Sequence, residues 1–351
     1  MLVRRESRTG ANELHTIYRP CTVSEMLGNK TNTNMIKKGL DNNTLSHTFL
    51  FTGDAGCGKT TMARIIALSL NCESFDEPTT TPCLKCSSCT SVLNHNSMDV
   101  IEINVGRSGG KDAVDNVVKD LPSSPFSARH KVIIFDEAHK LTSAAQDLLL
   151  KVIEDGYSHV FFVFATNHPE KLSDTFMTRC NVMHFGRISK DLIAGMLKNV
   201  AEFEAMDYKP EVLDYIAEES RGVPRNALVW LKQTNDEGSW LIDSVKEIVG
   251  ISLGADDPKI IEISKALLKG SFKSAVNIYD KIKNKNQAES VRIGITSYMV
   301  GCLKRAKNFP EGKRFSTILD IITQPIYEQG RLGDYKLYNY LFKVTCVIKG
   351  K

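Results

Sequence analysis

Eight consecutive residues decide the fold of this chain, and they are Gly53-Asp54-Ala55-Gly56-Cys57-Gly58-Lys59-Thr60. They fit the pattern G-x-x-x-x-G-K-[ST], whose glycines let the backbone curl so that N–H groups point at phosphate oxygens. Lys59 can reach the β- and γ-phosphates of a nucleotide, and the Thr60 hydroxyl can hold Mg²⁺. An apolar run at 47–53 precedes the loop, and a helical pattern from 59 to about 70 follows it. This context predicts a strand, a phosphate-binding loop and a helix whose N-terminus favours anions.

A second motif, Val132-Ile133-Ile134-Phe135-Asp136-Glu137, supplies carboxylates for such a site. Its apolar residues predict a buried strand, Asp136 is expected to bind Mg²⁺ through water, and Glu137 to polarise the attacking water. Residues 136–139 also spell Asp-Glu-Ala-His, as in some helicases. Those helicases need a second α/β domain with further arginines, whereas the chain after Phe185 has helical periodicity. We therefore expect no helicase and a structural role for His139.

The surrounding sequence is typical of an α/β protein. Further apolar runs at 99–105 and 160–166 predict buried strands, and 142–155 predicts a helix that starts at Thr142 or Ser143. Buried strands separated by helices indicate βαβ units and a parallel sheet. Three domains are expected: an α/β domain at 1–186, a small helical domain at 187–248 and a helical C-terminal domain at 249–351.

The composition is that of a globular protein. The chain has 351 residues, of which 42% are apolar and 25% charged, with a formal net charge of +4, which excludes a disordered or low-complexity chain. It contains no apolar run of about 18 residues, and its polar N-terminus does not resemble a signal peptide. These features predict a cytoplasmic protein with no membrane partner.

The charge is divided unevenly along the chain. Residues 249–351 hold 18 Lys/Arg and 9 Asp/Glu, a net charge of +9, whereas residues 1–248 hold 27 and 32, a net charge of −5. A basic domain can face nucleic acid or an acidic partner, but a lysine-rich helical surface exposed to water has the same composition. The charge alone does not separate these alternatives.

Four of the nine cysteines lie close together in the sequence, at Cys72, Cys83, Cys86 and Cys89. The odd count and the lack of a signal peptide argue against a disulfide framework. Four thiolates with C-x-x-C spacing favour tetrahedral Zn²⁺ in a closed, structural site. Iron–sulfur ligation is compatible with the spacing as well.

Taken together, these motifs resemble those of AAA+ clamp-loader ATPases, and more narrowly the gamma/tau subunits of bacterial DNA polymerase III in a short, gamma-like form. The resemblance covers about Tyr18 to Thr234 and is weaker beyond. It implies that the segment Tyr18-Arg19-Pro20 packs against the adenine and that Asn167 senses the γ-phosphate. It further implies that Arg179 acts in trans on the ATP of a neighbouring subunit and that Arg225 reaches the nucleotide from a helical lid. The full set of nucleotide-binding residues expected is Tyr18, Arg19, Pro20, Gly53, Asp54, Ala55, Gly56, Cys57, Gly58, Lys59, Thr60, Thr61, Asp136 and Arg225.

The same resemblance implies cofactors and partners. ATP, Mg²⁺ and Zn²⁺ are expected, with zinc favoured over iron–sulfur because the family has a zinc module at this place. The partners implied are a sliding clamp, primer–template DNA contacted by Arg107, Ser108 and Lys111, and other clamp-loader subunits in a pentamer joined by a collar at 249–351. Two alternatives stay open: another DNA-directed AAA+ motor, for branch migration or helicase loading, and a scaffold subunit that does not hydrolyse ATP.

Overall fold

The computed structural model describes residues 13–106, 111–242, 244–245, 248–249, 258–282, 288–304, 306, 308–324, 326 and 331–350. The chain divides into two compact units, residues 1–238 and 239–351. The three-domain division, with boundaries near 186 and 248, stays a prediction. None of the helices in the described part of the chain combines the length and the hydropathy that crossing a membrane requires.

The first unit is built on a five-stranded, all-parallel sheet with the strand order β2-β3-β4-β1-β5. The strands span β1 Thr48–Thr52, β2 Val100–Asn104, β3 Lys131–Asp136, β4 Val160–Thr166 and β5 Asn181–His184. The prediction of a parallel α/β sheet is confirmed, and the four predicted strands all form. Strand β5, which pairs with β1 at the edge of the sheet, was not predicted.

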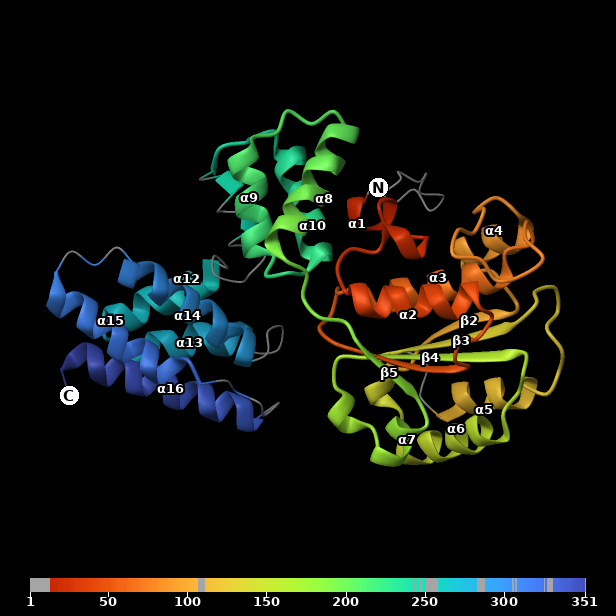
Figure 1. The fold of residues 1–351 in the computed structure, drawn as a ribbon. Helices are drawn as coiled ribbons and strands as arrows, with labels where there is room; N and C mark the ends of the chain where they lie inside the picture. Colours follow the sequence, from red (N-terminus) through yellow and green to blue (C-terminus); the bar gives the residue numbers. More distant parts are fainter. Residues whose placement is uncertain are drawn as a thin grey trace. The chain divides into compact units, whose positions relative to one another are not determined.

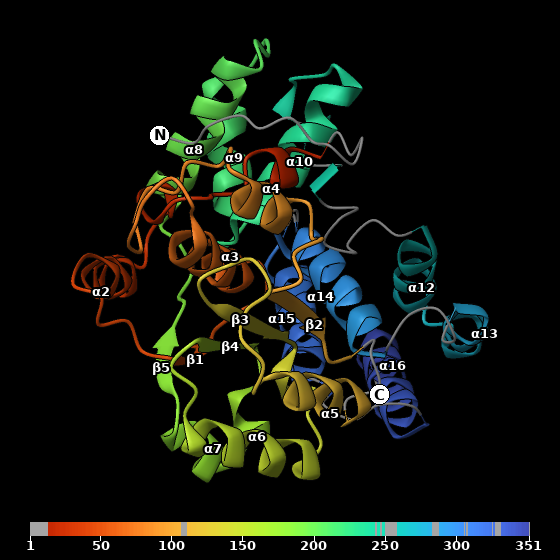
Figure 2. The ribbon, with the colours of Figure 1, turned by 90° about the vertical axis from the view of Figure 1, so that its right-hand side faces the viewer.

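Helices cover both faces of this sheet, with α3 on one side and α5, α6 and α7 on the other (Figure 1; Figure 2). Alternation along β1 sends Phe49 and Phe51 into one apolar core and Leu50 into the other. Because both faces are buried, β1 is apolar along its length, as is typical of a central parallel strand. The helices between the strands and before β1 are α2 Lys30–Asp41, α3 Lys59–Asn71, α4 Ser87–Leu93, α5 Lys111–Asp120, α6 Ser143–Asp155 and α7 Asp174–Thr178.

Four short helical segments and three longer helices complete the described part of the first unit. At the N-terminal side of the sheet domain lie α1 Leu14–Ile17 and η1 Val23–Glu25, and two single turns, η2 Ala138–Lys140 and η3 Pro169–Lys171, follow β3 and β4. After β5 come three helices, α8 Lys190–Phe203, α9 Pro210–Glu219 and α10 Pro224–Glu237. The Tyr18 hydroxyl donates to Glu204 Oε1 at 2.7 Å, so the segment before the sheet contacts the end of α8.

The second unit is helical in its described part, as its periodicity predicts. Its helices are α12 Pro258–Leu268, α13 Phe272–Ile282, α14 Ala288–Lys304, α15 Phe309–Ile322 and α16 Arg331–Lys349. They share one apolar core that includes Ile263, Tyr279, Val291 and Leu341. The Tyr279 hydroxyl donates to Asp334, so α13 is also tied to α16 by a polar contact.

Candidate nucleotide-binding site and cysteine cluster

A cavity of about 320 Å³ opens at the carboxyl edge of the sheet. Parallel strands end there together, so residues distant in the sequence converge at this edge. The predicted residues that line the cavity are Tyr18, Arg19, Pro20, Ala55, Gly56, Cys57, Gly58, Lys59, Thr60, Thr61, Asp136, Glu137, Asn167 and Arg225. Gly53 and Asp54, at the start of the loop, do not line the cavity, and neither does Arg179.

The phosphate loop has the strained backbone that its glycines permit. Gly53 has φ +127°, and a Cβ atom there would lie 2.1 Å from the carbonyl oxygen of Phe185, so no other residue fits this approach. Gly58 has φ +102° and caps the N-terminus of α3. The loop is therefore held between the end of β1 and the segment after β5, where the Phe185 N–H donates to the Thr52 carbonyl at 2.7 Å.

Lys59, the first residue of α3, is 7% exposed. Its Nζ donates to the carbonyl oxygens of Gly53 and Asp54, at 2.8 Å each. Burial lowers the pKa of Lys59, while the neighbouring Cys57 and Asp136 act in the opposite direction. The ammonium group is thus held at the loop by carbonyls rather than by a carboxylate, an arrangement that an anionic ligand can replace.

Two carboxylates lie at the carboxyl end of β3, with Asp136 as its last residue and Glu137 directly after it. The Thr60 hydroxyl donates to Asp136 Oδ2 at 3.0 Å, and the other Asp136 oxygen accepts from the Glu137 N–H at 2.9 Å. A hydroxyl and a carboxylate oxygen so close together are the hard oxygen ligands that Mg²⁺ prefers, so the pair fits this ion. Glu137 has φ +55°, a left-handed conformation that is unusual for a side chain of this size, and its Oε2 lies 2.6 Å from Lys140 Nζ.

Basic residues crowd the part of the cavity nearest the helices α1 and α10. Burial lowers the pKa of Arg19 to about 10, and the charges of Arg64 and Arg225 act in the same direction. Arg64 is itself paired with Glu102 by two hydrogen bonds of 2.8 Å. The positive potential at this end favours an anionic ligand.

Sequence reasoning missed several residues of the cavity. Its walls also contain His15, Met26, Leu27, Asn104, Thr166, Ile188, Met196, Pro224 and Leu228. Two thirds of them are apolar: Met196 in α8 and Pro224 and Leu228 in α10 have the periodicity of ordinary core residues, and Met26, Leu27 and Ile188 lie outside the helices. The apolar ones among them offer a surface of the kind against which a nucleobase packs, whereas Asn104 and Thr166 lie at the ends of β2 and β4.

Arg179 follows α7 and is half exposed. Its Nε donates to Glu154 Oε1 at 2.8 Å, and it does not line the cavity of its own chain. An exposed ion pair of this kind contributes little to stability. The arginine is therefore accessible to another molecule.

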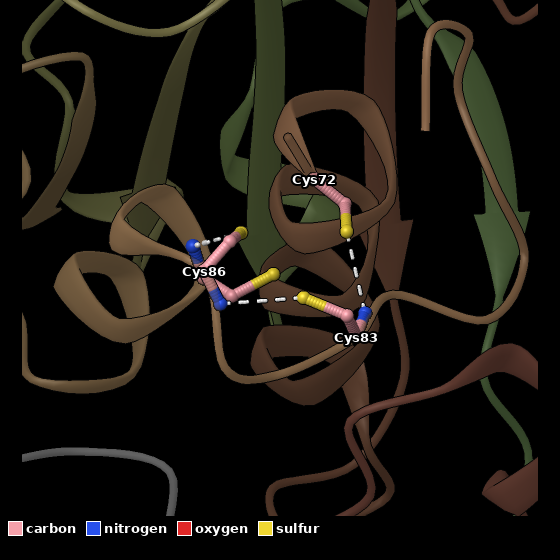
Figure 3. Close-up of side chains that lie close together, drawn as sticks. Cys72, Cys83 and Cys86 are labelled. Carbon is pink, nitrogen blue, oxygen red and sulfur yellow. Dashed lines mark hydrogen bonds between the residues drawn. The ribbon is translucent and has the colours of Figure 1, made fainter. Parts of the chain in front are cut away.

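The four clustered cysteines come together beside the C-terminus of α3, and Figure 3 shows three of them, Cys72, Cys83 and Cys86. Their sulfur atoms all lie within 4.8 Å of one another, and a tetrahedral Zn²⁺ with bonds of about 2.3 Å needs sulfurs about 3.8 Å apart. Backbone N–H groups donate to three of these sulfurs, with Cys83 N at 3.2 Å from Cys72 Sγ, Cys86 N at 3.3 Å from Cys83 Sγ and Cys89 N at 3.4 Å from Cys86 Sγ. A hydrogen bond from Ser74 lowers the pKa of the Cys83 thiol to about 6. The donor set fits a thiolate-bound metal ion.

The predicted DNA contacts cannot be placed in the same way. Arg107 and Ser108 lie outside the described residues. Lys111 begins α5, and its side chain lies outside the described part as well. These three assignments stay predictions.

A parallel sheet with a phosphate-loop motif after β1, paired carboxylates at the end of β3 and a polar residue after β4 defines a P-loop protein of the AAA+ class. The fold of RuvB from Thermotoga maritima, named as a Holliday junction branch migration motor, is similar, with a TM-score of 0.51. That match covers 84% of this chain and 94% of RuvB at 18% identity, so it shows a common fold alone.

Sequence comparisons narrow the class to one family. Residues 28–189 match the family model described as DNA polymerase III, delta subunit. The DNA polymerase III subunit gamma of Buchnera aphidicola is 30% identical over 268 residues, which cover 76% of this chain and 71% of the relative. The chain belongs to the DNA polymerase III gamma/tau family.

Two other members of the family extend well beyond the region that aligns with this chain. The subunit gamma/tau of Mycoplasma genitalium is 30% identical over 267 residues, covering 76% of this chain and 44% of the relative. The subunit tau of Bacillus subtilis is 32% identical over 220 residues, covering 63% of this chain and 39% of the relative. The chain thus spans less than half the length of these two relatives.

Proposed function

We propose that this chain is an ATP-hydrolysing subunit of a clamp loader, which places a sliding clamp on primer–template DNA. The observation that carries the proposal is the convergence of Lys59, the Thr60–Asp136 pair and Glu137 on one cavity of a gamma/tau family member. A scaffold subunit that does not hydrolyse ATP would not need all of these groups together.

In the proposed reaction, the ATP phosphates lie on the loop and the adenine packs near Tyr18 and Pro20. Lys59 exchanges its loop carbonyls for β- and γ-phosphate oxygens. Bound Mg²⁺, held by Thr60 and through water by Asp136, would neutralise charge on the same phosphates. Glu137 accepts a proton from the attacking water as the water oxygen bonds to the γ-phosphorus and the bond to ADP breaks. Asn167 can hydrogen-bond the γ-phosphate or this water.

The arginines make hydrolysis depend on the state of the assembly. Arg225 lines the cavity from α10, so we assign it to the lid contact expected of the helices α8 to α10. Arg179 lies outside its own cavity and is accessible, which suits an arginine that completes the site of a neighbouring subunit. Such a role requires an oligomer, for which the helical unit that contains α12 to α16 would form the collar.

We assign Zn²⁺ to the four cysteines as a structural ion. All four ligand positions are protein sulfurs, so no position is left for water, and the site is not expected to be catalytic. ATP binding would shift the assembly toward a form that holds the open clamp, and primed DNA would trigger hydrolysis and release.

The test is ATP hydrolysis by the full-length chain, measured alone, with its clamp, with primed DNA and with both, adding subunits that co-purify. Strong stimulation only with clamp and primed DNA together is the result expected. Stimulation by DNA regardless of the clamp would favour another DNA-directed motor. If the rate equals that of Lys59→Ala in every mixture, the chain is a scaffold.

Arg179→Ala adds a test of the trans assignment. The variant should bind ATP like the parent chain, yet mixtures with the parent should lose activity in proportion to the fraction of variant. A normal rate in assemblies made wholly of Arg179→Ala would contradict this role.

A further inference from the structure

His139 makes contacts that its sequence position does not predict. It lies in the single turn η2, two residues after Glu137, and its Nδ1 is 3.2 Å from Thr166 Oγ1 at the end of β4. Thr166 is 1% exposed, and its hydroxyl oxygen also accepts from the His168 N–H at 3.0 Å. The His139 and His168 rings meet edge to face, with centroids 5.1 Å apart. One buried hydroxyl thus joins the turn after β3 to the turn after β4.

These two turns carry the groups that face the γ-phosphate in the proposed function. Glu137 is held in a left-handed conformation, which costs free energy and persists only where surrounding contacts fix it. Within the turn, the Lys140 N–H donates to the Glu137 carbonyl at 2.9 Å. Asn167 directly follows Thr166, so a shift of one turn relative to the other would change the distance between Glu137 and Asn167.

We propose that His139 is a positioning residue, which through Thr166 holds the Glu137 carboxylate in register with Asn167 for attack on the γ-phosphate. The inference rests on the proposed ATP hydrolysis and adds a component to it. His139 does not line the nucleotide cavity and acts through Glu137.

The direction of the hydrogen bond defines the state of His139 that this role requires. In the arrangement that we propose, the Thr166 hydroxyl donates to Nδ1 of a neutral His139 ring while its oxygen accepts from the His168 N–H, which a hydroxyl with one proton and two lone pairs allows. Burial lowers the pKa of His139, and the charges of His168, Lys171 and Lys140 lower it further, whereas Glu137 raises it. Glu170, whose Oε1 lies 2.9 Å from His168 Nδ1, is the remaining charged neighbour of the pair. A neutral ring at pH 7 is thus favoured, and protonation of Nδ1 in acid would remove the acceptor.

The test compares ATP binding and hydrolysis in the full-length chain carrying His139→Ala, His139→Asn, Thr166→Val or Thr166→Ser, each with clamp and primed DNA. His139→Ala and Thr166→Val should lower kcat about 10-fold, the equivalent of one hydrogen bond, and His139→Ala, at a residue that does not line the cavity, should leave the Kd for ATP within about 3-fold. The double variant should be no slower than either single one. His139→Asn, which keeps an acceptor near the Nδ1 position, and Thr166→Ser should recover most of the rate.

The pH profile separates positioning from general packing. The fall in kcat on acidification that depends on His139 should be absent in His139→Asn, because an amide does not titrate. An unchanged kcat in His139→Ala would overturn the inference while the proposed function stands, and so would equal losses in all four variants with weakened ATP binding. If the parent chain is as inactive as Lys59→Ala, the proposed function fails and the inference fails with it.

Discussion

The two ends of helix α3 carry the two candidate sites of this chain, and they differ in how their polar groups are paired. At the N-terminus, Lys59 contacts loop carbonyls beside an open cavity. At the C-terminus, Asn71 exchanges two hydrogen bonds with the backbone of His130, and Arg129 Nη2 donates to the Cys72 carbonyl at 2.7 Å. The N-terminal end of α3 around Lys59, here called the open end, can exchange a ligand without unfolding. The C-terminal end around Asn71 and Cys72, here called the closed end, is built into the packing of the domain. One rigid helix can thus carry two candidate sites of different character.

Lys59→Ala should have the largest effect and should confine it to the open end. Loss of the ammonium group that neutralises the phosphates is expected to lower ATP hydrolysis about 100-fold or more. Thermal unfolding without nucleotide should be unchanged or occur at slightly higher temperature, since a buried charge is removed. Hydrolysis assays with thermal melts check both. A large loss of stability in this variant would mean that the N-terminal end is structural too.

Cys86→Ser should have the opposite effect to Lys59→Ala, because it should lower the stability of the closed end. Zinc measured in the purified chain should fall well below one ion per chain, and a site weakened 100-fold would lose about 2.7 kcal/mol of stability at fixed free zinc. Cys346→Ser, which changes a cysteine outside the cluster, is the matched control and should keep both zinc and stability. Full zinc content with an unchanged melting temperature in Cys86→Ser would remove the basis for the metal site.

The open end was the easier one to predict from sequence. A phosphate loop must be contiguous, so Gly53 to Thr60 identified it, and four apolar runs identified their strands. Strand β5 was missed because it is short and at the edge of the sheet, where Val182 is half exposed and no apolar run forms. The side of the cavity formed by α8 and α10, with Met196 and Leu228, was missed because helical apolar residues predict burial but not the ligand that they face.

The closed end was predicted only in its ligands. The spacing of the cysteines indicates a metal site, but no pattern in the sequence relates Asn71 to His130 or Arg129 to Cys72. These contacts depend on how α3 packs beside β3, which is a property of the tertiary fold. The same holds for His139 and Thr166, which share no motif.

Asn71→Ala tests whether the hydrogen bonds of the closed end stabilise the fold independently of the proposed zinc ion. Asn71 is 1% exposed, and its loss leaves the N–H and carbonyl of His130 without these partners. The expected cost is about 2 kcal/mol, which chemical denaturation can measure. Asn94→Ala, at an exposed helix end, should cost much less. If zinc removal abolishes the difference between these variants, the ion rather than the hydrogen bonds organises this end.

The smallest effect on stability should come from acid, through Asp99 and the loop at residues 126–130 that it holds. Asp99 is buried, and its carboxylate accepts from the backbone N–H groups of Phe126, Ser127 and Ala128 at 2.6–2.8 Å. Burial acts to raise the pKa of Asp99, but these hydrogen bonds outweigh it, and the pKa lies below its ordinary value. A carboxyl with a lowered folded-state pKa stabilises the fold above its unfolded pKa of about 3.9 and loses this contribution as the pH falls through the folded value.

The comparison of Asp99→Asn with the parent chain isolates this contribution, because zinc release in acid affects both alike. The parent should be the more stable by about 1–2 kcal/mol at pH 7, and the difference should shrink only below about pH 4. Urea unfolding from pH 7 to pH 3 gives the two curves. Since the loop ends at Arg129 and His130, the loss should appear in the stability of the closed end and leave the ATP affinity at pH 7 unchanged. A parallel loss of ATP affinity would show that α3 transmits strain between its ends, and the two sites would then be coupled rather than merely joined.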